Sequence, residues 1–102
     1  MMNGLRLAQM KPGAFLINTA RGDIVDDNAL IAALLSGHLA GAGLDVYRNE
    51  PDLDSRYLGM EDVVVLPHLG SATRETREAM GFRALENLEA FFDGRPVPDR
   101  VA

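Results

Sequence analysis

Four polar residues of this 102-residue sequence are of the types that bind an anion and move a proton. Arg21, Asp45, Glu50 and His68 come from three separate parts of the chain. Histidine is the side chain best suited to proton transfer near neutral pH. A neighbouring carboxylate favours its protonated form, and arginine can bind a carboxylate through two parallel hydrogen bonds. Together these residue types predict a site that holds a small anion and transfers a proton.

Taken singly, each of these residues also has an ordinary structural explanation. Arg21 precedes a glycine and could lie in a solvated turn, while Asp45 could form a turn and Glu50 could be a loop acid. A histidine at the end of a strand is more often hydrogen-bonded within the fold than catalytic. We expect this structural role for His38, which follows a glycine at the end of a predicted helix. The functional interpretation of Arg21, Asp45, Glu50 and His68 therefore depends on whether the fold brings them together.

Three short apolar stretches predict strands of a parallel sheet. Residues 14–18, 41–46 and 63–66 do not alternate between apolar and polar, which is typical of strands covered on both faces. Residues 28–36 have the apolar face of a helix that connects the first two strands by a right-handed crossover. The carboxyl ends of such strands lie side by side and form the ligand-binding crevice. We therefore predict an α/β fold with a partial Rossmann-like parallel sheet of about three strands and flanking helices.

Acidic residues and glycines predict where these elements begin and end. Asp26 and Asp27 are suited to cap the helix at residues 28–36, and Gly37 is suited to end it. Gly22 can take backbone conformations that are closed to other residues. These positions predict a tight turn after the first strand and a short helix before the second.

Further helices and a tail complete the predicted fold. Residues 1–10 are interpreted as the end of a helix, residues 54–58 as one helical turn, and residues 72–92 as a long helix beside the sheet. Residues 95–102 are predicted to form an extended tail. Apolar residues at helical spacing along the long helix are expected to form a buried stripe: Met80, Ala84, Leu85, Leu88, Phe91 and Phe92.

The composition is typical of a small globular domain. The sequence is 47% apolar and 25% charged, and its net charge of −5 argues against a general nucleic-acid surface. It has no cysteine, which excludes disulfides and thiolate chemistry. No apolar run is long enough to span a bilayer and no signal-peptide pattern is visible, so we expect a cytoplasmic protein without a membrane partner.

Three other kinds of site lack their sequence signature. The two histidines are thirty positions apart and no paired metal-ligand spacing occurs, so no metal site is predicted. Ser71 is not in a Gly-x-Ser-x-Gly motif, which argues against a serine hydrolase. No Gly-x-Gly-x-x-Gly phosphate loop is present either.

Three long motifs nevertheless resemble one enzyme family. Residues 15–25 (FLINTARGDIV), 41–51 (GAGLDVYRNEP) and 66–73 (LPHLGSAT) resemble the D-isomer-specific 2-hydroxyacid dehydrogenases, and they follow one another in the order and at the intervals of that family. Residues 66–77 and 87–101 look most like glyoxylate/hydroxypyruvate reductases. The resemblance covers essentially the whole chain.

The resemblance implies catalytic roles for three of the four candidate residues. Arg21 would orient the carboxylate and carbonyl of a small 2-oxo or 2-hydroxy acid. His68 would act as the acid in reduction and as the base in oxidation, with Glu50 paired to it. The reaction implied is hydride transfer with NAD or NADP, and no nucleic acid takes part.

The resemblance also implies which residues contact the cofactor. Thr19, Ala20 and Arg21 would line the nicotinamide, and Asp45 would lie at or near its carboxamide. His68 and the residues that follow it, Gly70 and Ser71, would border the ring.

Members of this family have two domains, and this sequence resembles only the C-terminal portion of the dinucleotide-binding domain. The phosphate loop and most of the substrate domain belong to the part that is not represented. We therefore expect the whole protein to be an NAD(P)-dependent reductase and a homodimer, and residues 1–102 to be inactive alone. Two alternatives remain open: a non-catalytic dinucleotide-binding module, and an interaction module without a ligand.

Overall fold

The structure is a computed structural model that describes residues 1–101. The chain divides into two compact units, Met1–Gly70 and the residues from Ser71 onward. The first unit contains the sheet and every candidate site residue except Ser71.

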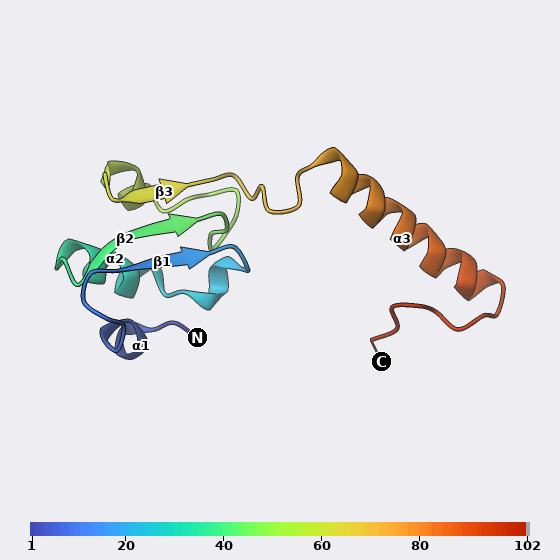
Figure 1. The fold of residues 1–102 in the computed structure, drawn as a ribbon, viewed down its shortest axis with the longest axis horizontal. Helices are drawn as coiled ribbons and strands as arrows, with labels where there is room; N and C mark the ends of the chain where they lie inside the picture. Colours follow the sequence, from blue (N-terminus) through green and yellow to red (C-terminus); the bar gives the residue numbers. More distant parts are fainter. Residues whose placement is uncertain (102) are drawn as a thin grey trace. The chain divides into compact units, whose positions relative to one another are not determined.

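The first unit is built on a three-stranded parallel sheet. Strands β1 (Ala14–Asn18), β2 (Leu39–Leu44) and β3 (Val63–Val65) are hydrogen-bonded in the order β1-β2-β3 (Figure 1). All three strands point the same way, so their carboxyl ends lie side by side at one end of the sheet (Figure 1). This confirms the predicted α/β architecture and the predicted bounds of the first strand.

The other two strands end earlier than predicted. β2 begins and ends two residues earlier, and β3 ends one residue earlier. Single backbone bonds continue the pairing beyond both strands: Asp45 N donates to Asn18 O at 3.0 Å, and Leu66 N donates to Leu44 O at 2.8 Å. Asp45 is therefore held by its backbone next to the end of β1, although it lies outside β2.

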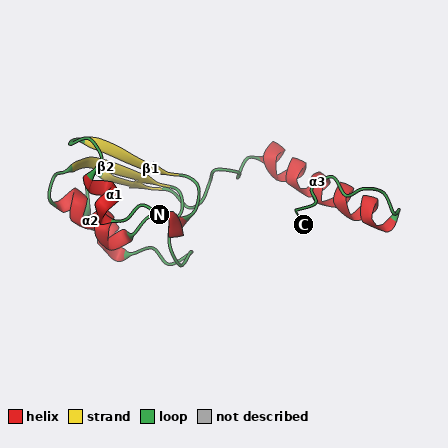
Figure 2. Ribbon diagram, turned by 90° about the horizontal axis from the view of Figure 1, so that it is seen from below, coloured by secondary structure: helices red, strands yellow, loops and turns green. Residues whose placement is uncertain are grey.

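Two helices cover one face of this sheet. Helices α1 (Gly4–Ala8) and α2 (Asp27–Leu35) lie together on the same side of the strands (Figure 2). Asp26 caps α2 by accepting a hydrogen bond from Ala29 N at 3.0 Å, and Gly37, with φ of 70°, follows the end of this helix. The predicted cap and stop are confirmed, and α2 begins and ends one residue earlier than predicted.

The core of the first unit lies between these helices and the sheet. Burial of the apolar side chains there is the main stabilising contribution to folding. The buried cluster comprises Leu7, Leu16, Val25, Leu30, Ile31, Leu34, Leu39, Ala42, Leu44 and Tyr57.

The opposite face of the sheet is open within residues 1–70, so the expectation that both faces are covered is wrong for this unit. The side chains of Phe15, Ile17 and Val64 are 67%, 69% and 62% exposed. Gly41 and Gly43 lie beside them, where an added Cβ would meet the ring of Phe15 and the side chain of Ile17 respectively. The apolar strands therefore present one buried and one exposed apolar face.

Two short 3-10 helices lie in the connections between strands. η1 (Gly22–Ile24) follows β1, and η2 (Ser55–Gly59) precedes β3, where a single helical turn was expected. Tyr57 fixes η2 to α2, because its buried hydroxyl donates to Asp27 Oδ1 at 2.9 Å. Burial is the main cause that raises the pKa of Tyr57, so its hydroxyl remains a donor.

The second unit contains the long helix α3 (Arg74–Phe92), which begins two residues later than predicted. Thr73 caps it by accepting a hydrogen bond from Thr76 N at 3.2 Å. The expectation of a buried stripe is not met in this chain. Among the described residues of α3 only Ala90 is buried, and the large apolar side chains of the expected stripe are exposed: Met80, Leu85, Leu88, Phe91 and Phe92.

Residues 93–101 turn back along α3 and are hydrogen-bonded to it through Asp99 (Figure 1). Asp99 accepts two hydrogen bonds from the Arg83 guanidinium, at 2.6 and 2.7 Å, and one from Asn87 Nδ2 at 2.8 Å. Asp99 N in turn donates to Asn87 Oδ1 at 3.0 Å. The hydrogen bond from Arg83 is the main cause that lowers the pKa of Asp99, so the charge of this clamp persists into mildly acidic solution.

Neither a membrane span nor a metal cluster is found in the described part of the chain. None of its helices is both long enough and apolar enough to cross a bilayer. No group of three or more histidine, aspartate or glutamate side chains is arranged to hold a metal ion there.

Candidate active site

The turn after β1 is shaped by Asn18 and presents Arg21. The buried Asn18 side chain accepts a hydrogen bond from Ala20 N at 3.1 Å and donates to Arg21 O at 2.9 Å. Arg21 also donates from Nη1 to Ala20 O at 2.6 Å. Thr19, Ala20 and Arg21 are exposed in this turn, at the carboxyl end of β1. Asn18 therefore fixes the backbone on which the exposed candidate residues lie.

Gly22 allows this turn to approach the loop after β2. A Cβ at Gly22 would overlap the backbone atoms of Tyr47 and Arg48. Gly22 is not among the glycines with positive φ, so it does not use the conformational freedom of glycine here. A glycine is required here because two backbone segments come into close contact. The approach brings the Arg21 turn to the segment that carries Glu50.

Asp45 holds the loop that follows β3. This buried carboxylate accepts hydrogen bonds from Leu69 N at 2.6 Å and from Gly70 N at 2.8 Å. Both of its oxygens are therefore engaged by backbone amides. In the structure Asp45 thus orders the backbone next to His68, and its contact with a cofactor stays a prediction.

Glu50 and His68 form a hydrogen-bonded pair between the loops that follow β2 and β3. His68 Nδ1 lies 2.7 Å from Glu50 Oε2, and Tyr47 N donates to Glu50 Oε1 at 2.9 Å. The bond from His68 is the main cause that lowers the pKa of Glu50, followed by the Tyr47 amide, and the charge of Arg21 lowers it further. Glu50 is therefore an anion at neutral pH and accepts a hydrogen bond from the Nδ1–H group of His68. Exchange of a proton with a ligand then falls to Nε2.

The backbone of His68 adopts a left-handed conformation with φ of 55°. Only a small fraction of residues other than glycine adopt this conformation, which costs about 1–3 kcal/mol unless the surroundings enforce it. Asp45 provides one such constraint through Leu69 and Gly70. His68 is therefore placed by the loop around it as well as by its own side-chain contact.

A shallow hollow of about 150 Å³ lies against this pair. It is lined by Tyr47, Glu50, Pro51, Pro67 and His68. The hollow combines apolar walls with one carboxylate and one imidazole. Such an arrangement can transfer a proton to a small polar molecule that lies against the histidine.

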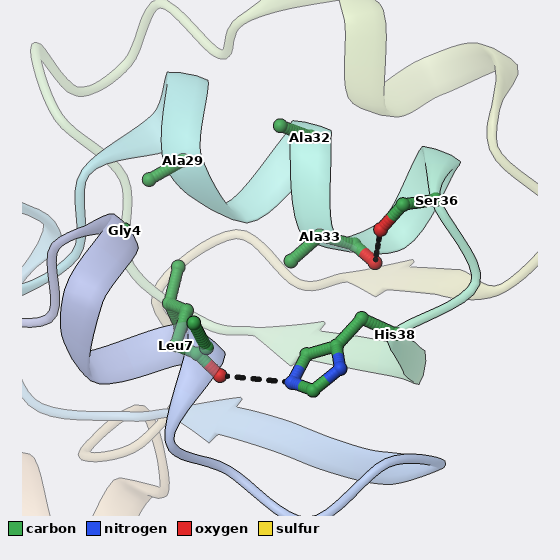
Figure 3. A pocket seen from close by; sticks show the side chains of 8 residues that line it. Gly4, Leu7, Ala29, Ala32, Ala33, Ser36 and His38 are labelled. Atoms are coloured by element: carbon green, nitrogen blue, oxygen red, sulfur yellow. Dashed lines mark hydrogen bonds between the residues drawn. The ribbon is translucent and has the colours of Figure 1, made fainter.

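The other histidine lies elsewhere and has a structural role, as expected. His38 Nε2 donates to Leu7 O at 3.1 Å and ties the segment before β2 to α1 (Figure 3). It lines a groove of about 370 Å³ whose other walls are small or apolar residues of α1 and α2 (Figure 3). None of the candidate catalytic residues lines this groove.

The structure brings most of the predicted site residues to the carboxyl ends of the strands. Glu50 and His68 are in contact, Asp45 bonds the backbone of Gly70, and Arg21 is close enough to influence Glu50 electrostatically. Ser71 is the first residue of the second unit.

Sequence analysis assigned no role to two residues that matter at this site. Asn18 shapes the turn after β1, and Tyr47 holds Glu50. The position of Asn18 at the polar end of an apolar strand is the one signal that could have identified it.

The family model and the similar proteins of known function all identify the same family. Residues 1–70 match the model of the D-isomer specific 2-hydroxyacid dehydrogenase NAD-binding domain. A glyoxylate reductase from Pyrococcus furiosus is 50% identical over 101 residues, which is 99% of this chain and 30% of the relative. A glyoxylate/hydroxypyruvate reductase B from Shigella boydii is 50% identical over 91 residues, 88% of this chain and 28% of the relative.

The same family is found among solved structures. An NADPH-dependent glyoxylate/hydroxypyruvate reductase from Sinorhizobium meliloti, in complex with NADP and malonate, superposes with a TM-score of 0.94 at 42% identity. The match covers 99% of this chain and 32% of that one. The chain thus spans about a third of the length of the relatives that it matches. The family match, the identity and the fold agree, and the chain belongs to the D-isomer specific 2-hydroxyacid dehydrogenases.

Proposed function

We propose that this chain supplies the acid–base pair and the substrate-binding arginine of an NAD(P)-dependent reductase. Its substrate would be a small 2-oxo acid of the glyoxylate or hydroxypyruvate class, which is converted to the 2-hydroxy acid. The observation that carries the proposal is the 2.7 Å contact between Glu50 Oε2 and His68 Nδ1. This contact lies at the carboxyl ends of parallel strands, where ligands bind in folds of this kind.

The proposed roles follow from the chemistry of the three side chains. Arg21 binds the substrate carboxylate through two hydrogen bonds and so orients the neighbouring carbonyl. His68 donates a proton from Nε2 to the carbonyl oxygen as negative charge develops there. Glu50 accepts a hydrogen bond from the Nδ1–H group of His68 and stabilises the positively charged imidazolium before the transfer. In the reverse direction His68 Nε2 accepts the proton of the 2-hydroxy acid.

The residues present fit the nicotinamide end of the cofactor. When bound, the reduced nicotinamide supplies the hydride that reduces C2 of the substrate. Thr19, Ala20 and Arg21 are exposed at the carboxyl end of β1, and Asp45 orders the loop of Gly70 that follows the proposed proton donor. His68 and Ser71 complete the set that we propose to border the ring.

Two further parts of the proposal concern the whole protein. We propose that it functions in the cytoplasm as a homodimer, in line with its acidic composition and its lack of cysteine. Because the chain spans about a third of the relatives, we also propose that residues 1–102 alone do not catalyse the reaction.

A hybrid enzyme tests the proposal. The matched 30% of the Pyrococcus furiosus glyoxylate reductase is replaced by this chain, which is half identical to it. The hybrid should reduce glyoxylate or hydroxypyruvate with NADH or NADPH. His68→Gln should lower the rate about 10²- to 10⁴-fold, the usual range of general acid–base catalysis. Arg21→Lys should also lose most activity, because an ammonium group cannot form the paired bonds.

Cofactor binding serves as the control for these variants. Both variants should lose far less affinity for the dinucleotide than activity, because neither change removes a phosphate contact. A hybrid that binds the dinucleotide and unfolds cooperatively, yet reduces neither acid, would refute the catalytic proposal. That result would favour the alternative of a non-catalytic dinucleotide-binding module.

A further inference from the structure

Tyr47 contacts segments that follow all three strands. Its backbone N donates to Glu50 Oε1 at 2.9 Å, and its hydroxyl donates to Leu66 O. The hydroxyl also lies 3.4 Å from Leu44 O, at the end of β2. The backbone of Tyr47 also lies so close to Gly22 that a Cβ atom there would have no room. One residue therefore joins the Arg21 turn, the Glu50 loop and the end of β3.

Tyr47 holds the chain just before His68, and Asp45 holds the chain just after it. Tyr47 holds the carbonyl of Leu66, two residues before His68, while Asp45 holds the amides of Leu69 and Gly70 just after it. The strained backbone of His68, with φ of 55°, lies between these two attachments. Such a conformation persists only where its surroundings enforce it from both directions.

The Tyr47 hydroxyl keeps its proton and so stays a donor at neutral pH. Its partial burial and the negative charges of Asp45 and Glu50 raise the pKa of Tyr47. A permanent donor is needed because Leu66 O and Leu44 O can only accept. The hydroxyl therefore remains a donor at neutral pH, where Glu50 is ionised.

We propose that Tyr47 is a positioning residue, which holds the end of β3 so that His68 Nδ1 meets Glu50. In this role Tyr47 acts through the pair, by way of its bonds to Glu50 Oε1 and Leu66 O. The proposal rests on the proposed function only in identifying Glu50 and His68 as the acid–base pair. The placement of the pair itself can be measured without any activity.

The first measurement is the tautomer ratio of His68 in the full 102-residue chain, read from imidazole ¹⁵N NMR at a pH where the ring is neutral. A bond from Nδ1 to Glu50 favours the Nδ1–H form. Tyr47→Phe keeps the ring and the Tyr47 N–H bond to Glu50 but removes the hydroxyl. The ratio of the Nδ1–H to the Nε2–H form of His68 should then fall about three- to tenfold, the effect of weakening one hydrogen bond.

The sequence provides two matched controls. Tyr57 is the only other tyrosine, and its hydroxyl donates to Asp27 away from the site, so Tyr57→Phe should leave the His68 ratio unchanged. His38 is the only other histidine and is bonded through Nε2 to Leu7 O. Its resonances should be the same in all three proteins. If Tyr47→Phe moves His38 and His68 together, the residue supports the fold in general and the proposal is wrong.

The second measurement is the kinetics of the hybrid enzyme. Tyr47→Phe should lower kcat about three- to tenfold and leave KM within about twofold, since the arginine that binds the substrate is untouched. Tyr57→Phe should change neither constant by more than about twofold.

The outcomes separate the two proposals. Identical tautomer ratios in Tyr47→Phe and Tyr57→Phe overturn the positioning role. An inactive hybrid whose His68 still responds to Tyr47→Phe in the NMR measurement refutes the proposed function and leaves the positioning role intact.

Discussion

His68 can donate a proton in reduction only while its ring is protonated, and the charge of Glu50 favours that state. Glu50 is ionised at neutral pH because the bonds from His68 and from Tyr47 N lower its pKa. Its negative charge, 2.7 Å from His68 Nδ1, stabilises the imidazolium form of the ring. Removing the charge should therefore weaken the proton-donating form.

Glu50→Gln removes the charge and keeps the size and the ability to accept a hydrogen bond. In the hybrid enzyme, at saturating cofactor, the alkaline limb of the reductive rate profile should move to lower pH by about one unit. Oxidation needs the unprotonated ring, so its acidic limb should move in the same direction. An alkaline limb that stays in place would show that the Glu50 contact does not govern proton transfer.

The position of Arg21, Glu50 and His68 at one end of the sheet could be predicted from the sequence, because each residue follows an apolar strand and parallel strands end side by side. The roles of Tyr47 and Asn18 were not predicted, because their side chains bind backbone atoms of the loops. The bonds from Tyr47 to Leu66 O and from Asn18 to Arg21 O depend on loop paths that no residue pattern specifies. Asp45 illustrates the same limit, since its two partners are amides of a loop more than twenty residues away.

Among the connecting elements, the turn at Gly22 makes the strictest steric demand. Gly22→Ala would place a Cβ into the backbone of Tyr47 and Arg48, which has no flexible side-chain end to move aside. The free energy of unfolding of the 102-residue chain should fall by about 1–3 kcal/mol, as for overpacking in a core. The measurement is the urea midpoint at constant slope.

Gly59 provides the control for that substitution. It lies in η2 with no atom within 4 Å of an added Cβ, so Gly59→Ala should change the stability by no more than about 0.5 kcal/mol. Equal midpoints for the two variants would mean that the close approach at Gly22 is not maintained in solution.

The helices show which features of an element the sequence can specify. Asp26 and Gly37 allowed the bounds of α2 to be predicted to within one residue, because a helix cap and a helix stop are local signals. The stripe on α3 was expected to be buried and is exposed, since periodic apolar residues indicate that a face favours a partner without identifying it. The return of the chain through Asp99 was not predicted, because it depends on the side chains of Arg83 and Asn87, which lie 16 and 12 residues before Asp99.

At the scale of the whole molecule, the main feature is the sheet, which has one unpaired edge at β1 and one exposed apolar face within residues 1–70. β1 is an edge strand, and Phe15 and Ile17 are exposed on the open face beside it. Exposed apolar edge strands favour pairing with other chains. We therefore predict that the 102-residue chain self-associates, with a mass in light scattering that rises with concentration.

Ile17→Lys should reduce this association, because it places a charge on the open face next to the edge. The matched control is Leu58→Lys, at a similarly exposed leucine of η2, which should leave the mass unchanged. If the unaltered chain is a monomer at high concentration, the prediction is wrong.

Gly22 has a further consequence for how the site could change during evolution. The distance between the Arg21 turn and the Glu50 loop is set by two touching backbones, and the ion pair of Arg48 Nε with Asp23 Oδ1, at 3.7 Å, also joins the two segments. Other side chains around this contact can be exchanged as a lineage diverges, while the backbone spacing is inherited unchanged. Position 22 itself cannot vary in this way, because every other amino acid has a Cβ atom and the contact leaves no room for one.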